Sequence, residues 1–156
     1  MLQEACVIPC TEFIPAYSEL FKFLDKKGGR QAVTDFWSYL TDNFLVNLKD
    51  LVEQNGIRGC WLYWNHTLNE EAADFTMELD EEAGEFRIVM HDCPSKRRLI
   101  ETQHIEPYPD YCGHCDFLYR RVLEPLGYDC TFDLSKCDHA QCAFIVRRKK
   151  IQALLR

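Results

Sequence analysis

The chain has 156 residues, of which 47% are hydrophobic and 13% aromatic, and its formal net charge at pH 7 is −7. This length and apolar content are typical of one globular domain rather than of a disordered chain, so we interpret residues 1–156 as a single domain. The negative charge repels a phosphate backbone, which argues against nucleic acid as a partner.

The first residues of the chain do not have the pattern of a targeting segment. They contain Glu4 and Glu12 and lack a long apolar run, so they predict neither a signal peptide nor a membrane span. We therefore expect a cytoplasmic protein. Stable disulfides are rare in that compartment, so the nine cysteines must serve in metal binding, catalysis or burial.

Helices are predicted from about residue 14 to 72. Pro15 occupies a favoured first position, and apolar residues follow at helical spacing until the glycine pair of DKKGG. A broad apolar stripe over about 30–54 predicts the main helix, which the next Asn-Gly pair would end. The segment IRGCWLYWNHTLNEEAADF is predicted to be mostly helical, with Thr67 and Glu70 as a capping box for a short helix.

Strand patterns follow over about residues 74–147. DFTMEL and EFRIVMHDC flank the acidic turn DEEAG and predict a hairpin, and YDCTFDLS and CAFIVRR predict a second one. Between them, Pro94 ends a strand before a short helix, and CDFLYRRVLEPLG predicts a helix closed by Gly127. We expect an α+β fold in which helices pack on one face of an antiparallel sheet of about four strands.

Five of the nine cysteines lie between residues 110 and 144. Cys112 and Cys115 have the two-residue gap that lets two thiolates reach one metal, and Cys115 is predicted to open a helix. Cys137 and Cys142 bracket a turn between two predicted strands. Together these side chains suit tetrahedral zinc. The candidate ligands are Cys112, Cys115, Cys137 and Cys142, with His114 or His139 able to replace one thiolate.

Other roles are open to these cysteines. Cys112 and Cys115 could form a redox-active CxxC motif, but such a motif should follow a strand of a βαβ unit, and here it follows a loop. Cysteine is also among the most frequently buried residue types. Burial is the expected role of Cys6, Cys60 and Cys130.

Cys93 lies at the end of a predicted strand, in HDCPS. Alternate residues of a strand share a face, so we expect His91 and Cys93 to meet and Asp92 to point away. The pair could act as base and nucleophile. Packing or a place in a pocket is the alternative.

The succession RIVMHDCPS, CDFLYRRVLEPLG and FDLSKCDHAQCAFIV, over about residues 74–147, resembles two known families. They are the 4-vinyl-reductase-like small-molecule-binding domains and the L-2-amino-thiazoline-4-carboxylic acid hydrolase family. The resemblance implies a fold similar to transport-protein-particle subunits, with an apolar ligand cavity between sheet and helices. It also implies zinc held at Cys115, Cys137 and Cys142. The gap DHAQ is shorter than in those sensors, and Cys112 and His114 are additional donors.

Our leading hypothesis is a zinc-stabilised domain that binds a small organic molecule in a cavity between helices and sheet. The aromatic residues expected to line it are Trp37, Trp61, Tyr63 and Trp64, although aromatics at helical spacing are more often core. A hydrolase of a small cyclic amide or thiazoline is the alternative, with His91, Cys93 or His114 as base or nucleophile. A partner-binding scaffold, dimerising through its first two helices, is a further alternative.

Overall fold

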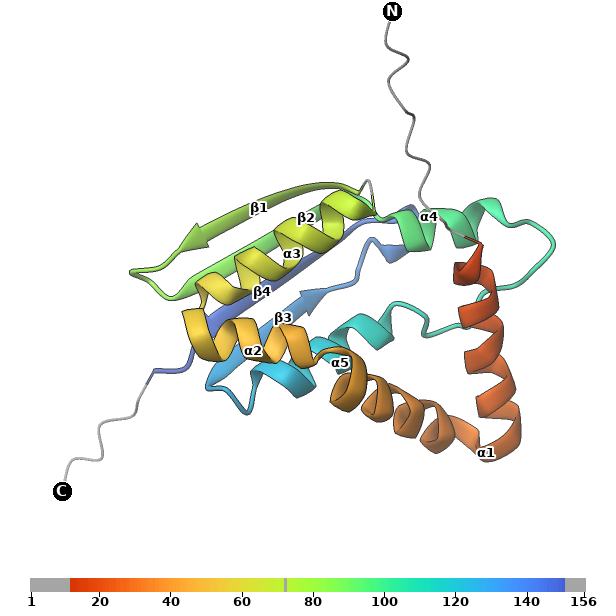
Figure 1. The fold of residues 1–156 in the computed structure, drawn as a ribbon. Coiled ribbons are helices and arrows are strands. Elements are labelled where there is room, and N and C mark those ends of the chain that lie inside the picture. Colours follow the sequence, from red (N-terminus) through yellow and green to blue (C-terminus); the bar gives the residue numbers. More distant parts are fainter. Residues whose placement is uncertain (1–11, 72, 151–156) are drawn as a thin grey trace, which may run out of the picture.

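The structure, a computed structural model, describes residues 12–71 and 73–150. Helices pack on one face of a four-stranded antiparallel sheet, which confirms the predicted α+β class (Figure 1). The elements are α1 (Phe13–Phe44), α2 (Val46–Asn55), α3 (Arg58–Glu70), β1 (Asp74–Asp80), β2 (Glu85–Asp92), α4 (Pro94–Glu101), α5 (Gly113–Leu123), β3 (Tyr128–Asp133), a 3₁₀ turn (Cys137–His139) and β4 (Cys142–Arg148).

The first helix continues through the glycine pair with a sharp bend instead of ending there. Gly28 and Gly29 leave helical geometry, and Gly29 has a φ of 68°, which a residue with a side chain rarely adopts. The two arms of α1 therefore diverge, as Figure 1 shows. The predicted main helix is also wrong in extent, because the chain breaks at Leu45 (φ −91°, ψ 20°) and buries that side chain before α2 begins.

The end of α2 and the helical character of α3 are confirmed. Gly56 closes α2 with a φ of 62°, and its N–H donates to the Val52 carbonyl at 2.8 Å. The predicted capping box is wrong. Thr67 lies inside α3, and its hydroxyl donates to the Tyr63 carbonyl one turn earlier at 3.2 Å.

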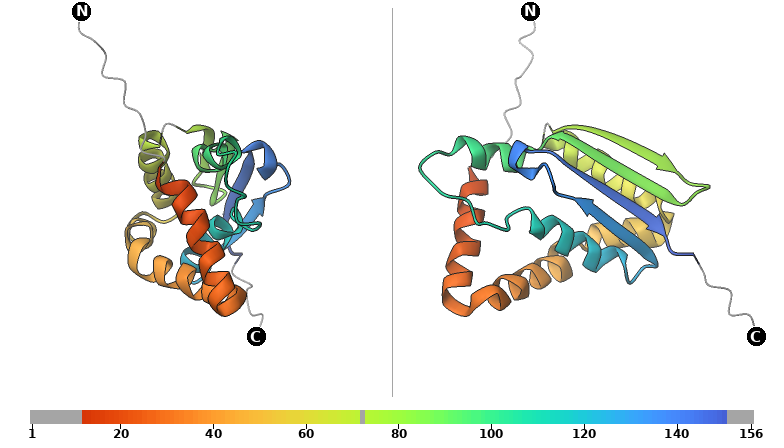
Figure 2. Two further views of the ribbon diagram at one scale, coloured as in Figure 1. Left: turned by 90° about the vertical axis from the view of Figure 1, so that its right-hand side faces the viewer. Right: turned by 180° about the vertical axis from the view of Figure 1, so that it is seen from behind.

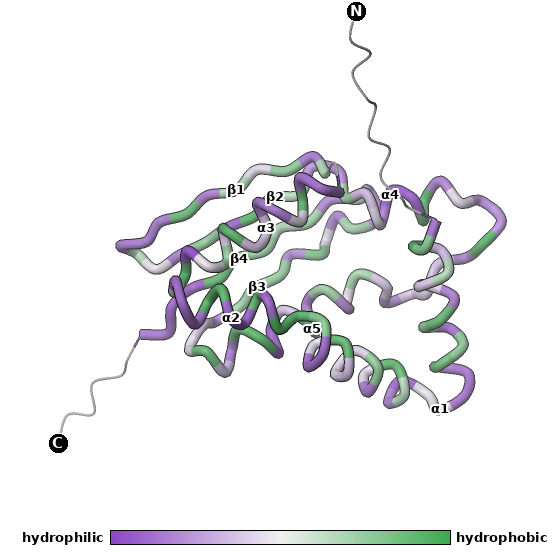
Figure 3. Tube along the Cα trace, viewed as in Figure 1, coloured by the Kyte–Doolittle hydropathy of each residue, from purple (hydrophilic) through white to green (hydrophobic). Residues whose placement is uncertain are grey.

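Both predicted hairpins are present, and their inner strands pair with each other. The strand order is β1-β2-β4-β3, and β2 pairs with β4 along Phe86 to Val146 and Ile88 to Phe144. These four side chains are buried beneath the helices. Hydrophobic and hydrophilic segments follow one another along α1 and β1, as the tube in Figure 3 shows. The opposite face of the sheet carries no helix in the described part of the chain (Figure 2).

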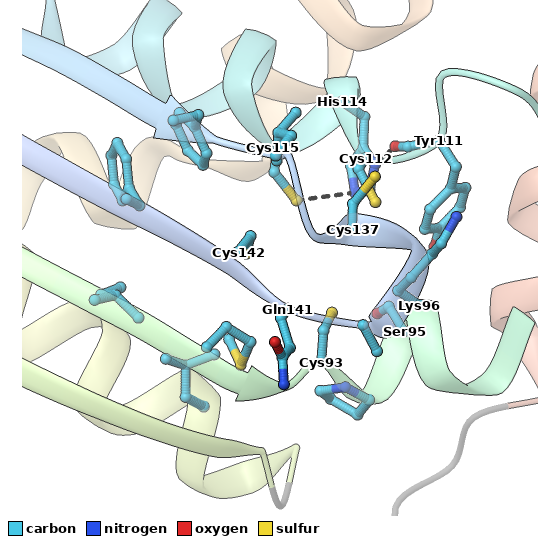
Figure 4. A pocket seen from close by; sticks show the side chains of 18 of the residues that line it. Cys93, Ser95, Lys96, Tyr111, Cys112, His114, Cys115, Cys137, Gln141 and Cys142 are labelled. Carbon is cyan, nitrogen blue, oxygen red and sulfur yellow. Dashed lines mark hydrogen bonds between the residues drawn. The ribbon is translucent and has the colours of Figure 1, made fainter. Parts of the chain in front are cut away.

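Helix α5 begins two residues earlier than predicted. Its first residue is Gly113, so Cys112 takes the N-cap position and Cys115 lies within the first turn. The helix ends at Leu123, and a turn through Gly127, with a φ of 90°, leads into β3. This placement brings both cysteines of the CxxC motif to the end of α5 that faces the sheet (Figure 4).

Candidate metal and ligand site

A cavity of about 180 Å³ lies between the sheet and helices α3 and α5. One part of its wall is apolar and largely aromatic, and it consists of Trp64, Leu68, Ile88, Met90, Tyr119, Phe132 and Phe144. The other part carries five thiols, those of Cys93, Cys112, Cys115, Cys137 and Cys142 (Figure 4). The four cysteines predicted as zinc ligands therefore line one cavity, together with Cys93.

The start of α5 depends on a close turn around Asp110. The N–H of Gly113 donates to the Asp110 carbonyl at 3.2 Å, and a Cβ on Gly113 would lie 2.2 Å from Oδ1 of that aspartate. The carboxylate is held in place by Arg30 of α1, at 2.5 Å. The glycine of the CxxC motif thus leaves room for the Asp110 carboxylate, which a side chain at this position would displace.

The other three thiols come from the meeting of β2 and β4. Cys142 opens β4 opposite Met90 of β2. Ala140 has a φ of 58°, and at this residue the chain turns from the 3₁₀ segment that contains Cys137 back toward β4. The Ala140 carbonyl accepts a hydrogen bond from the N–H of Cys93 at 2.7 Å. Strand pairing therefore brings together thiols that are about fifty residues apart in the sequence.

His114 is the histidine of the cluster. Its Nδ1 is hydrogen-bonded to the Tyr111 carbonyl, so Nδ1 carries the proton and Nε2 has a free lone pair. Nε2 lies 3.5 Å from Sγ of Cys115. Burial lowers the pKa of His114 and favours the neutral ring. His139, the other histidine considered as a ligand, is exposed on the 3₁₀ turn and does not line the cavity.

Four thiols of the cavity have raised pKa values, which favours their protonated form. Burial raises the pKa of Cys93 to about 11 and that of Cys115 and Cys142 to about 12. Burial, and next the charge of Cys115, raises the pKa of Cys112 well above its usual range. Burial also raises the pKa of Glu71, whose carboxyl lies in the same wall. A metal ion entering here would have to displace thiol protons.

The donors suit a soft or borderline metal, but they do not surround one point. Thiolates with one imidazole are the ligands that zinc prefers. Within the described ranges, no three Cys, His, Asp or Glu side chains are arranged as a ligand group. Binding would therefore require rotations of the cysteine side chains.

His91 and Cys93 do not share a face, contrary to expectation. Cys93 packs against the core and lines the cavity, whereas His91 is exposed on the other face, where Nε2 lies 2.6 Å from the Thr76 hydroxyl. The reason is local. The strand ends at Asp92, and Cys93 already serves as N-cap of α4, so strict alternation no longer applies.

Of the four predicted pocket aromatics, only Trp64 lines the cavity. Trp37 is fully buried in the core, 5.3 Å from the ring of Phe21, and Tyr63 is buried against Trp64. Trp61 is half-buried and packs against the same core. Sequence reasoning missed lining residues such as Phe132 and Phe144, although the alternation along the strands marks them as inward-facing.

The remaining cysteines behave as expected where the structure describes them. Cys60 and Cys130 are buried, and burial raises the pKa of each to about 12. Cys6 lies outside the described residues.

Comparison with known proteins yields no match: no family model fits the sequence, and no curated protein is significantly similar to it. The resemblance to the two families stays a prediction that rests on the quoted motifs. In the helices of the described residues, no segment is both long and apolar enough to cross a membrane.

Proposed function

We propose that this chain is a domain that binds a small organic molecule in the thiol-lined cavity, and that a zinc ion held by its cysteines stabilises the site. The observation that carries the proposal is one cavity with two kinds of wall: aromatic side chains on one side and five thiols from separate segments on the other. Such a division supplies an apolar binding surface and a metal-binding surface at the same place.

The cavity volume limits the size of the ligand. Pockets for drug-sized molecules measure about 300–1,000 Å³, whereas an engineered cavity of about 150 Å³ holds benzene. At about 180 Å³, this cavity suits a single ring with one or two small substituents. Lys96 lies in the wall with its side chain only 14% exposed, and its ammonium is 3.6 Å from the exposed Asp138 carboxylate. Because Asp138 is largely in solvent and compensates this charge only in part, one substituent of the ligand would be anionic.

Zinc would have a structural role in this scheme. Cys112 is the N-cap of α5 and Cys115 lies in its first turn, whereas Cys137 comes from the 3₁₀ turn and Cys142 from β4. Four donors, either the four thiolates or three of them with Nε2 of His114, close the coordination sphere and leave no position for water, so the ion would hold the helix against the second hairpin. Cys93 would then be the fifth thiol, free to contact the organic ligand.

Metal analysis with variants tests the zinc proposal. Protein purified without added metal should contain about one zinc per chain, as for a single structural site. Cys115→Ser should lose the metal, whereas Cys93→Ser should retain it and change only ligand binding. Metal-free protein of undiminished stability would contradict the proposal.

The organic ligand is tested with two single-ring probes, benzoate and neutral toluene, in an NMR titration. Both should perturb resonances of Trp64 and Phe144, and Lys96→Gln should weaken benzoate binding without affecting toluene. Perturbations spread evenly over the surface, with none in the cavity, would argue against a binding site there.

A hydrolase of a small cyclic amide or thiazoline is the second candidate, because the Cys115 thiol lies 3.5 Å from the free lone pair of His114. A thiol beside an imidazole is the arrangement of a nucleophile and its base. The raised pKa of Cys115 opposes this role, since the thiolate is the reactive form. Turnover of such a substrate, abolished by His114→Gln in protein that still folds, would favour the hydrolase.

A further inference from the structure

A second cavity is lined in part by residues of the sheet face that carries no helix in the described part of the chain. The right-hand view of Figure 2 shows this face of the sheet. The cavity is a polar groove of about 330 Å³ near the turn that precedes β4. Six of its residues carry the argument: Arg87, Val89 and His91 of β2, Asp133 at the end of β3, Lys136 in the turn, and Ala143 of β4.

The strand register explains the shape of the groove. Val89 pairs with Ala143, so two small apolar side chains form its floor. Arg87 and His91 precede and follow Val89 by two residues and point to the same face. At about 3.3 Å per residue, they stand about 13 Å apart along β2.

Arg87 differs from most other arginines of the described chain in having no carboxylate partner among the described residues. Most other arginines of the described chain pair with a carboxylate, namely Arg30, Arg58, Arg97, Arg98, Arg120, Arg121 and Arg147. Arg87 makes no hydrogen bond or ion pair among the described residues, although Glu78 stands opposite it on β1. In a chain of net charge −7, a guanidinium left free in a groove is available to an anion from solution.

The other polar side chains of the groove determine which kind of anion would bind there. Lys136 likewise has no ion pair among the described residues and supplies a second cation. Asp133 stays ionised, because hydrogen bonds from Ser135 lower its pKa. A carboxylate in the wall repels a bare anion but accepts hydrogen bonds from hydroxyl groups.

We propose that this groove binds a small phosphorylated metabolite that carries hydroxyl groups. Arg87 and Lys136 hold the phosphate, because the guanidinium fork matches two phosphate oxygens and the ammonium adds a point charge. The Asp133 carboxylate accepts hydrogen bonds from the hydroxyl groups of the metabolite, and the carbon chain of the metabolite lies on Val89 and Ala143. The groove shares Met90, Gln141 and Cys142 with the thiol-lined cavity, but none of the residues assigned here to the phosphate, the hydroxyl groups or the carbon chain lines that cavity.

A titration of ¹⁵N-labelled full-length protein with ribose 5-phosphate tests the site. Amide shifts should concentrate at Arg87, Val89, Lys136 and Ala143, and Arg87→Gln should weaken binding about tenfold or more, as expected for a lost charged hydrogen bond. Arg147→Gln is the matched control. It removes the same charge from the same face, but Arg147 is already bonded to Glu85 at 2.6 Å.

Three results would overturn the proposal. They are no localised shifts, equal weakening by Arg147→Gln and Arg87→Gln, and equal shifts with ribose lacking phosphate. The second would show attraction by general charge, and the third would show that the phosphate is not recognised. Arg87 is exposed, so its replacement leaves the fold intact and the comparison interpretable.

Discussion

The free ring nitrogen of His114 faces the thiol of Cys115 at 3.5 Å, while its other nitrogen is bonded to the Tyr111 carbonyl. This pair lies in the first turn of α5, where the Tyr111 carbonyl and the surrounding rings of Tyr17, Phe21 and Tyr111 orient the imidazole. A histidine whose tautomer is fixed by a carbonyl is the usual form of a metal-binding imidazole.

His114→Gln should therefore lower the affinity for zinc by about 10–100-fold, the effect typical of losing a ligand or its support. Competition with a chromophoric chelator measures the affinity, and circular dichroism verifies folding. His139→Gln is the control, because this histidine is exposed and lies outside the cavity, and it should bind zinc as the parent does. Equal affinity in both variants would remove His114 from the site.

Removal of zinc should lower the melting temperature. A ligand at one hundred times its dissociation constant stabilises the folded state by about 2.7 kcal/mol, and a chelator removes this contribution. Differential scanning calorimetry with and without chelator gives the shift. Cys115→Ser, which cannot retain the ion, should melt at the same temperature in both conditions. A chelator effect of equal size in this variant would show that the metal binds elsewhere.

Trp37→Ala should cost about 3–5 kcal/mol of unfolding free energy, as large-to-small changes in a core do. The side chain is fully buried between the two arms of α1 and α5. Its indole Nε1 has no hydrogen-bond partner among the described residues, so Trp37→Phe should cost much less. Urea unfolding measures both. Tyr39, 63% exposed on the same helix, is the control, and its replacement by Ala should change stability by less than about 0.5 kcal/mol. Equal effects at the two positions would contradict the placement of Trp37.

Gly59→Ala should destabilise the junction of α2 and α3. A Cβ at Gly59 would lie 2.4 Å from the Leu51 carbonyl oxygen, and a backbone atom inside a helix cannot move aside cheaply. We expect a loss of about 1–3 kcal/mol in urea unfolding, the usual cost of overpacking. At Gly113 the nearest atom belongs to the Asp110 carboxylate, which can rotate into solvent, so Gly113→Ala should cost less. The reverse order would show that the two helices are less closely packed than described.

The sheet was predictable because the alternation of apolar residues along the strands is its direct signal. The pairing of β2 with β4 was not, since it depends on contacts between distant segments rather than on any local pattern. The break at Leu45 was missed for a related reason. Leu45 continues the apolar stripe, and only packing against the core decides that the chain turns there.

The candidate site shows the same division. The spacing of four cysteines and the turns beside them predicted that these residues lie close together. They line one cavity, and they are Cys112, Cys115, Cys137 and Cys142. The separation of His91 from Cys93 was not predictable. Cys93 lies just past the end of β2, so it no longer follows the alternation of the strand. We expected the aromatic residues of the pocket on the helices. Trp37 is instead a core residue, and strand residues such as Phe144 form part of the cavity wall.

The insertion of β4 between β2 and β3 has a consequence for biosynthesis. Of the four described strands, β4 is the last to leave the ribosome, yet it is a central strand and it carries Cys142. Until it emerges, β2 has one unpaired edge, β3 has no partner and the cavity lacks a wall. Unpaired edges invite association with other chains. The nascent protein therefore passes through a stage in which its strands are exposed and its site is incomplete, and a chain halted before Cys142 would be prone to aggregate.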